Sequence, residues 1–405
     1  MSEIIKIVLN SGKDQSPKRF HPWIFSGAVK RVEGEVKNGD IAEVYSSGNE
    51  YLGTGHYQKG SIMVRLFSFE KIVPDASFWK SKIQKAYDYR NSIGLTKGAN
   101  TNVYRLVYGE GDGLPGLIID FYNETAVFQA HSIGMYRERN SIVEALKEIY
   151  GEKLKAVYDK SKESLGSSGT KVPSEGAEEN TEIKNGYLFG NGSEKEVLEN
   201  GHKFSIDWEE GQKTGFFIDQ RENRKLVAEY ANGKKVLDCF CYAGGFSVYA
   251  LKSGAVEVHS VDSSKSAIKL TDNNINLNFG DESRHTSFVA DAFEFLGSHS
   301  HEYDMIVIDP PAFAKHRDAR HQAVMGYRRL NALAIKGIKP SGIIFTFSCS
   351  QVVDKYLFQG AITAAAIDSG RNVRILKFLS HPADHPISIY HPEGEYLKGM
   401  ILYVE

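Results

Sequence analysis

The chain has only three cysteines in 405 residues, and it lacks any apolar run of the roughly 20 residues that a membrane-spanning helix needs. So few cysteines exclude a disulfide framework and fit a reducing compartment. Cys239 and Cys241 lack the second cysteine pair of a structural zinc site, so we expect no metal. The opening MSEIIKIVLN shows no secretory signal. These absences predict a cytoplasmic protein with no membrane partner.

Strong net charge is also missing. The formal charge of −2 gives no global argument for a nucleic-acid partner, and 25% charged with 41% hydrophobic residues is typical of a globular protein. One local stretch differs, because residues 312–339 hold seven lysines and arginines against a single acid, Asp318. A solvated helix face explains such a stretch, and so does a rim that contacts phosphates.

The pattern of the chain predicts three domains. Residues 1–72 alternate short apolar and polar runs broken by glycines, which indicates a small β-rich domain in which Trp23 and Phe25 of HPWIFSGAV anchor the core. Residues 73–205 mix helical and strand-like runs and indicate an α+β middle domain. In it we expect residues 160–182 to form a loop and the strand-like runs 186–189 and 202–207 to pair.

From residue 206 to residue 405 the pattern becomes βαβα, which predicts an α/β Rossmann-like domain with helices as crossovers between parallel strands. The proline-rich link HPADHPISIYHPEGEY cannot form a crossover helix, so we expect the last strand to return antiparallel. The seven predicted strands of this sheet are residues 235–240, 257–262, 287–291, 303–309, 342–348, 373–379 and 398–404.

Residues 235–247, KVLDCFCYAGGFS, read as a buried strand that breaks into a tight loop and opens a helix. Asp238 lies in this strand, and the next strand ends in Asp262. Ligands bind beyond the carboxyl ends of the strands of such a sheet, so both acids are expected to face one pocket. The loop lacks the GxGxxG of a dinucleotide site. A nucleoside cofactor without phosphates, S-adenosyl-L-methionine (SAM), fits better than a nicotinamide dinucleotide.

Two further strand ends carry candidate chemistry. Asp309 begins the DPP motif of YDMIVIDPPAF, where two prolines stiffen the exit from the sheet beside Phe313, so that the acid can orient a planar base. Cys349 follows the strand GIIFTFS; a buried cysteine is usually inert, but a thiolate that adds to C6 of cytosine makes C5 nucleophilic. Methylation of an exocyclic nitrogen needs no such thiolate. Asp291 can reach an adenine amine or cap a helix equally well.

Several motifs occur together in a fixed order: HPWIFSGAV, GEGDGLPGLIIDFY, GQKTGFFIDQRENR, LDCFCYAGGFS, IDPPAF, FSCS and DHPISIYHPEGEYLKG. With them the chain resembles the bacterial large-subunit (23S) ribosomal RNA cytosine-5 methyltransferases that carry an N-terminal PUA domain. The resemblance implies a PUA-like RNA-binding domain, a class I methyltransferase domain whose seven-stranded sheet ends in an antiparallel hairpin, SAM as cofactor and large-subunit ribosomal RNA as partner. A homodimer is left open.

The resemblance also implies residue roles. The predicted catalytic residues are Cys349 and Asp309. The predicted cofactor-binding residues are Phe217, Asp219, Gln220, Arg221, Asp238, Tyr242, Gly244, Asp262, Ser263, Asp291, Asp309 and Pro310. The predicted substrate-binding residues are Pro311, Phe313, Lys315, Arg317 and Arg328.

Two departures from the family pattern matter. Ala312 stands where members commonly carry lysine, and no cysteine follows the DPP motif, so product release would need another base. Two alternative functions remain: an N-methyltransferase that acts on adenine or guanine of ribosomal RNA, and a non-catalytic RNA-binding ribosome assembly factor.

Overall fold

The computed structural model describes residues 5–166, 183–192, 194–314 and 316–405, and the chain divides into two compact units. The first unit consists of Met1–Val197, Asp207–Phe216 and Ala383–Gly394. The second consists of Leu198–Ile206, Phe217–Pro382 and Glu395–Glu405. Among the helices formed by the described residues, none has the length and apolar character to cross a bilayer.

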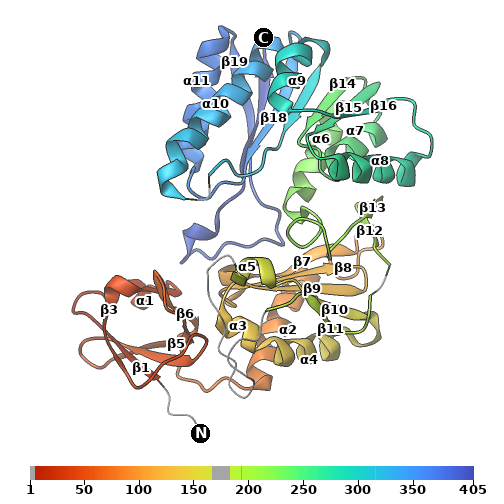
Figure 1. Ribbon diagram of the computed structural model, residues 1–405. Helices are drawn as coiled ribbons and strands as arrows, with labels where there is room; N and C mark the ends of the chain where they lie inside the picture. The colour runs from red at the N-terminus through yellow and green to blue at the C-terminus, as the bar shows by residue number, and fades with distance from the viewer. Residues whose placement is uncertain (1–4, 167–182, 193, 315) are drawn as a thin grey trace. The chain divides into compact units, whose positions relative to one another are not determined.

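The first unit begins with a six-stranded sheet in the order β2-β6-β5-β4-β1-β3, red in Figure 1. Its elements are β1 (Ile5–Leu9), α1 (Gln15–Lys18), β2 (Trp23–Phe25), β3 (Val29–Glu33), β4 (Ile41–Tyr45), β5 (Tyr51–Tyr57) and β6 (Ile62–Ser68). Fully buried side chains such as Ile7, Val44 and Val64 fill its core. The prediction that Phe25 anchors this core is wrong. Because successive side chains of a strand point to opposite faces, Ile24 points inward while Phe25 is 44% exposed.

A five-stranded sheet in the order β11-β10-β9-β8-β7 follows in the same unit. Its elements are α2 (Ala76–Ser92), β7 (Val103–Tyr108), β8 (Leu117–Tyr122), β9 (Thr125–Ala130), α3 (Ile133–Arg137), α4 (Arg139–Tyr150), β10 (Ala156–Asp159), α5 (Lys162–Gly166) and β11 (Gly186–Phe189). Its core is apolar and includes Trp79 and Leu146. Helix α5 occupies the start of the predicted 160–182 loop, whose residues 167–182 lie outside the described part of the chain.

The predicted pairing of residues 186–189 with residues 202–207 is wrong. β11 pairs with β10, whereas β13 (His202–Ser205) forms a two-stranded sheet with β12 (Glu196–Glu199). The reason lies in the two residues between β12 and β13, Asn200 and Gly201, which both have positive φ, at 51° and 79°. An Asn-Gly pair of this conformation makes the tight turn of a hairpin, so β13 pairs with its immediate predecessor.

The second unit is built on a seven-stranded sheet in the order β16-β15-β14-β17-β18-β20-β19. Its strands are β14 (Lys235–Cys239), β15 (Glu257–Asp262), β16 (His285–Val289), β17 (Met305–Ile308), β18 (Gly342–Ser348), β19 (Val373–Leu379) and β20 (Lys398–Val404). The first five are parallel, while β20 runs antiparallel to both β18 and β19. Every residue of β18 is buried, as a central strand covered on both faces requires.

Helices cover this sheet in two groups that can be followed in Figure 1. Helix α10 contacts both α9 and α11, and helix α7 contacts both α6 and α8. Their bounds are α6 (Arg221–Ala231), α7 (Gly245–Lys252), α8 (Lys265–Phe279), α9 (Ala292–His299), α10 (Arg320–Gly337) and α11 (Lys355–Ser369). Because β14, β15, β17 and β18 run parallel, their carboxyl ends meet at one edge of the sheet, and the candidate site lies there.

Candidate cofactor and substrate site

The loop that follows β14 has an unusual backbone. Phe240, Tyr242 and Gly244 all have positive φ, at 63°, 48° and 69°. Such conformations are costly for residues with side chains and gather where a backbone is shaped around a ligand. Glycine is required at 244, because a Cβ there would lie 2.7 Å from Thr271 Cγ2. The tight loop predicted between β14 and α7 is therefore present, and it places α7 directly behind it.

Asp238 is fully buried beneath this loop. Its Oδ2 accepts hydrogen bonds from the Ser247 hydroxyl (2.7 Å) and the Ser247 backbone N–H (3.2 Å), while Oδ1 has no hydrogen-bond partner among the described residues. Burial, reinforced by the nearby charges of Asp309 and Asp262, raises the pKa of Asp238 to about 7. A buried acid with an unsatisfied oxygen and acidic neighbours favours a cationic ligand.

Asp262, at the end of β15, is tied to the same loop. Its Oδ2 accepts from the backbone N–H of Tyr242 (3.2 Å) and its Oδ1 from that of Ser264 (2.9 Å). These bonds fix the carboxylate at the edge of the sheet and leave it further lone pairs. The neighbouring Ser263 is exposed.

Asp291 adopts the helix-capping role that the sequence left open. It precedes α9, and its Oδ1 accepts from the N–H groups of Phe293 (2.8 Å) and Glu294 (3.1 Å). Asp291 also lines an open pocket with Phe293, Glu294, Arg329 and Leu333. Capping uses one carboxylate oxygen, so Asp291 can still accept a hydrogen bond from a ligand in this pocket.

The segment before α6 brings further predicted residues to the edge. Gln220 Nε2 donates to Asp309 Oδ2 (3.0 Å), and the ring of Phe217 packs edge-on against Tyr242 with centroids 5.0 Å apart. The Tyr396 hydroxyl donates to Asp219. Sequence reasoning missed Tyr396, since 177 residues separate it from its partner.

Arg221 of the same segment is buried, and its Nε lies 3.3 Å from Glu222 Oε1. Its predicted neighbours on the cofactor side, Asp219 and Gln220, are buried as well.

Cys349 lies beside the DPP motif. Its Sγ is 3.9 Å from the carbonyl oxygen of Pro310, and its side chain is partly exposed. Cys239 and Cys241 are buried instead, and burial raises the pKa of both thiols well above the ordinary value. A thiol that stays protonated is a poor nucleophile. Cys349 is thus the cysteine with the position and exposure to reach a substrate.

A lysine that sequence reasoning missed holds the backbone that follows Cys349. Lys398, the first residue of β20, is buried, and its Nζ donates to the carbonyl oxygens of Ser350 (2.6 Å) and Val353 (2.5 Å). Burial lowers the pKa of Lys398 to about 8, and the nearby Cys349 opposes that shift. The available signal was a lysine at the start of the otherwise apolar strand KGMILYV, because buried lysines are rare without a specific partner.

The predicted substrate rim is only partly assembled. Pro311 and Arg317 are exposed, and Lys315 lies outside the described residues. Phe313 is half-buried, with its ring 4.7 Å from that of Tyr327. Arg328 makes a two-pronged ion pair with Asp368 (2.6 and 2.7 Å), which neutralises part of the basic stretch.

The residues at this edge fit SAM. Bound SAM would supply an electrophilic methyl group on a sulfonium, and its second cation is an ammonium. Asp238, with its unsatisfied buried oxygen, is suited to the cationic end. Asp262 keeps carboxylate lone pairs that can accept from hydroxyl groups, and Asp291 lines an open pocket.

Comparisons with known proteins identify two regions of the chain and its fold. A family model described as a PUA-like domain matches residues 7–69, and one described as an S-adenosylmethionine-dependent methyltransferase matches residues 180–370. Two solved structures align with 99% of this chain and 100% of their own, each at 23% identity. They are a protein from Streptococcus mutans assigned as a SAM-dependent methyltransferase (TM-score 0.82) and the methyltransferase-assigned SMU.776 complexed with SAH (TM-score 0.84).

Fold and site together define a SAM-dependent methyltransferase with an N-terminal PUA-like domain. Curated relatives narrow this class. Ribosomal RNA large subunit methyltransferase I of Aeromonas hydrophila is 39% identical over 405 residues, and that of Pseudoalteromonas atlantica 37% identical over 404; the alignments cover 98% of this chain and 98% and 99% of those proteins. The chain belongs to the ribosomal RNA large subunit methyltransferase I family. The resemblance inferred from the sequence is confirmed, and so is SAM as the cofactor.

Proposed function

We propose that this protein methylates C5 of a cytidine in large-subunit ribosomal RNA through a covalent adduct at Cys349. Relatives that span almost the whole chain are named as large-subunit ribosomal RNA methyltransferases, which supports the RNA class. The observation that carries the choice of atom is the partly exposed Cys349, whose Sγ lies 3.9 Å from the DPP motif at the cofactor edge of the sheet.

The proposed role of Cys349 follows from the chemistry of cytosine. C5 is not nucleophilic enough to attack a methyl group unaided. When the Cys349 thiolate adds to C6, the electron pair of the C5–C6 double bond becomes available at C5, which accepts the methyl group. A base then removes the proton from C5, the electron pair re-forms the double bond, and the thiolate leaves. No second cysteine follows the DPP motif, so that base is not a thiol of this segment.

Asp309 is proposed to orient the target base. Gln220 holds its Oδ2, and the following prolines keep the segment stiff. A carboxyl group so held can hydrogen-bond the N3 and amine edge of cytosine and fix the ring for attack at C6. Lys398 is proposed to keep the backbone around Cys349 in place and to favour the thiolate through its positive charge.

We further propose that RNA docks on the N-terminal PUA-like domain and on the exposed part of the basic stretch 312–339. This assigns residues 1–72 to RNA binding, 73–205 to a middle domain and 206–405 to methyl transfer. Because shape and single-stranded loops dominate RNA recognition, the domains rather than the catalytic residues would select the nucleotide. Because the proposed substrate is ribosomal RNA, we propose that the protein acts in the cytoplasm.

Trapping on RNA that contains 5-azacytidine tests the mechanism. Nitrogen at position 5 leaves no proton to remove, so the adduct persists after methyl transfer. We expect an RNA–protein adduct with the wild-type chain, none with Cys349→Ala, and methylation lowered at least about a thousandfold in that variant. Cys239→Ala is the matched control, because it removes a buried thiol. Wild-type protein that methylates the RNA at an exocyclic nitrogen without an adduct would refute the proposal and favour the N-methyltransferase alternative.

A further inference from the structure

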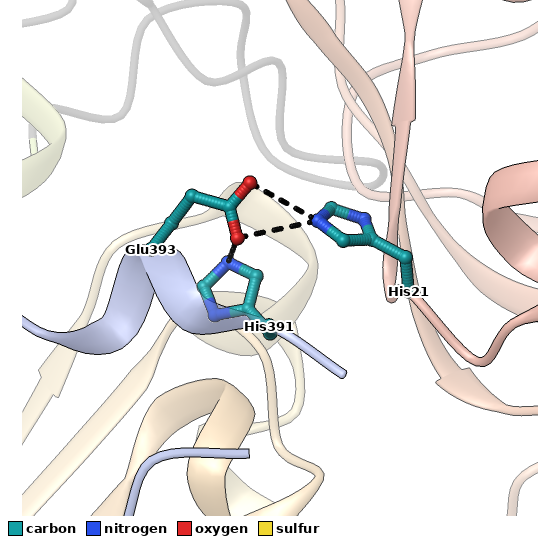
Figure 2. Close-up of side chains that lie close together, drawn as sticks. All are labelled: His21, His391 and Glu393. Atoms are coloured by element: carbon teal, nitrogen blue, oxygen red, sulfur yellow. Dashed lines mark hydrogen bonds and ion pairs between the residues drawn. The ribbon is translucent and has the colours of Figure 1, made fainter. Parts of the chain in front are cut away.

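Three potential metal ligands from distant parts of the sequence meet in the first unit (Figure 2). His21 lies just before β2, whereas His391 and Glu393 lie at the short 3-10 helix η7 (Pro392–Gly394). Figure 2 shows both imidazole rings pointing toward the Glu393 carboxylate. The segment that carries His391 and Glu393 returns to this unit near the end of the chain.

The spacing of the three side chains suits a small transition-metal ion. His21 Nε2 lies 3.3 and 3.4 Å from the two Glu393 oxygens, and His391 Nε2 lies 3.8 Å from Glu393 Oε2. One ligand atom from each residue falls within 4.8 Å of the others. Ligands about 2.1 Å from a tetrahedral zinc ion are about 3.4 Å apart, so little movement would let all three bind one ion.

His391 is the least satisfied member of the cluster. Its side chain is 3% exposed, and neither ring nitrogen has a hydrogen-bond partner among the described residues. A buried polar atom without a partner destabilises the fold, and an ion bound to Nε2 would supply a partner for one of the two ring nitrogens.

The ring of His391 is held in place by its surroundings. It packs edge-on against the indole of Trp23, with centroids 4.3 Å apart, and Trp23 Nε1 donates to Glu110 Oε1 (2.8 Å). A fixed ring loses little conformational entropy when it binds an ion. Glu393 is 46% exposed, so an ion can enter from the solvent side.

We propose that His21, His391 and Glu393 bind one divalent transition-metal ion, for which zinc is the best match. Two imidazoles with one carboxylate suit zinc and its neighbours in the first transition row, whereas magnesium and calcium prefer all-oxygen sites. Three protein ligands leave a fourth position for water. The ion would cross-link the start of the chain to residues 391–393 and stabilise their association. The expectation of no metal considered only the cysteines.

Metal titration of the full-length protein tests this. Protein stripped with a chelator is titrated with Zn²⁺ by calorimetry, and with Co²⁺ while visible absorption and tryptophan fluorescence are followed. We expect one ion per chain, visible bands of Co²⁺ bound by nitrogen and oxygen, and partial quenching of the tryptophan emission, because Trp23 is one of three tryptophans. His21→Ala and Glu393→Gln should each weaken binding at least about tenfold. The matched control, His301→Ala, removes an exposed histidine outside the cluster and should bind as the wild type does.

Two results would overturn the proposal. One is equal affinity in the wild type, His21→Ala and Glu393→Gln. The other is binding that only Cys349→Ala abolishes, which would place the ion on the thiol. Far-UV circular dichroism and thermal unfolding of each variant show that the variants are folded. Because the readout is metal binding and not methyl transfer, the outcome is independent of the cytosine-5 mechanism.

Discussion

The buried carboxyl of Asp238 predicts that SAM binding depends on pH. In the free protein its pKa is raised to about 7, because the group is fully buried near Asp309 and Asp262. If Asp238 receives the ammonium of SAM, it must be ionised in the complex. The ligand then selects the deprotonated form, so binding releases a proton wherever the free protein holds one.

The size of the effect follows from the ionised fraction. About half of the Asp238 groups are ionised at pH 7 and about 3% at pH 5.5, so the affinity for SAM should fall about 16-fold between these values, or about 1.6 kcal/mol. An α-amino group keeps its charge throughout this range, since its ordinary pKa is about 7.7–8.0. The expected loss of SAM affinity therefore comes from protonation of the protein and not of the ligand.

Calorimetry in buffers of different ionisation enthalpy measures both quantities. At pH 6 we expect release of about 0.9 proton per SAM bound. Asp238→Asn should bind SAM more weakly at pH 7 and without this pH dependence. Ser247→Ala removes the hydroxyl that donates to Asp238 Oδ2, so it should move the midpoint to higher pH by about one unit. An affinity that stays constant from pH 7 to 5.5, with no proton released, would refute the assignment of Asp238 to the cationic end.

Two further predictions concern other buried groups. Burial, aided by Arg137, lowers the pKa of His56 to about 3. The unfolded chain therefore binds a proton below about pH 6.5 that the folded chain does not, and stability should be lost as the pH falls from 6.5 toward 3, by about 3 kcal/mol at pH 4.5. Denaturant unfolding of His56→Phe should show a correspondingly smaller loss, and an equal loss would contradict this. Lys398→Met should slow adduct formation at Cys349 about tenfold and shift its pH profile upward by about one unit. A slower rate with an unshifted profile would mean that Lys398 only supports the backbone.

The main elements of the second unit are readable from the sequence because buried parallel strands are continuous apolar runs. The strands Glu257–Asp262 and Gly342–Ser348 have the bounds that their sequences indicate. The convergence of Asp238 and Asp262 also follows, since the ends of parallel strands share one edge. The Asn200-Gly201 hairpin is also readable from the sequence, because an Asn-Gly pair between two short strands favours a two-residue turn.

Other parts of the site depend on contacts that no local pattern encodes. Tyr396 reaches Asp219 across 177 residues, and Lys398 supports the backbone beside Cys349 from the final strand. Asp291 shows a different limit of prediction from sequence. An acidic residue just before a helix can cap the helix or bind a ligand, and the sequence does not distinguish the two roles. Only the folded structure shows that its Oδ1 accepts hydrogen bonds from two backbone N–H groups.

The link between β19 and β20 shows why such contacts escape a sequence pattern. Its prolines correctly exclude a crossover helix, yet residues 383–394 are an integral part of the first unit and not a simple hairpin loop. Tyr89 donates to the Ala383 carbonyl (2.8 Å), and Tyr108 donates to that of Gly394 (2.7 Å). The buried Asp384 accepts from the backbone N–H of Arg105 (3.0 Å).

These bonds give the proline-rich composition a physical reason. A segment that must leave one folded unit, bind along another and return gains from prolines, because they lower the entropy that the unfolded chain loses when the segment is fixed. The polar residues of HPEGEY, which look like ordinary loop residues, then have two tasks. His391 and Glu393 meet His21 in the first unit, and Tyr396 holds Asp219 in the second. A substitution in this short motif should therefore be assigned to a unit by its position relative to Gly394 before its effect on activity is interpreted.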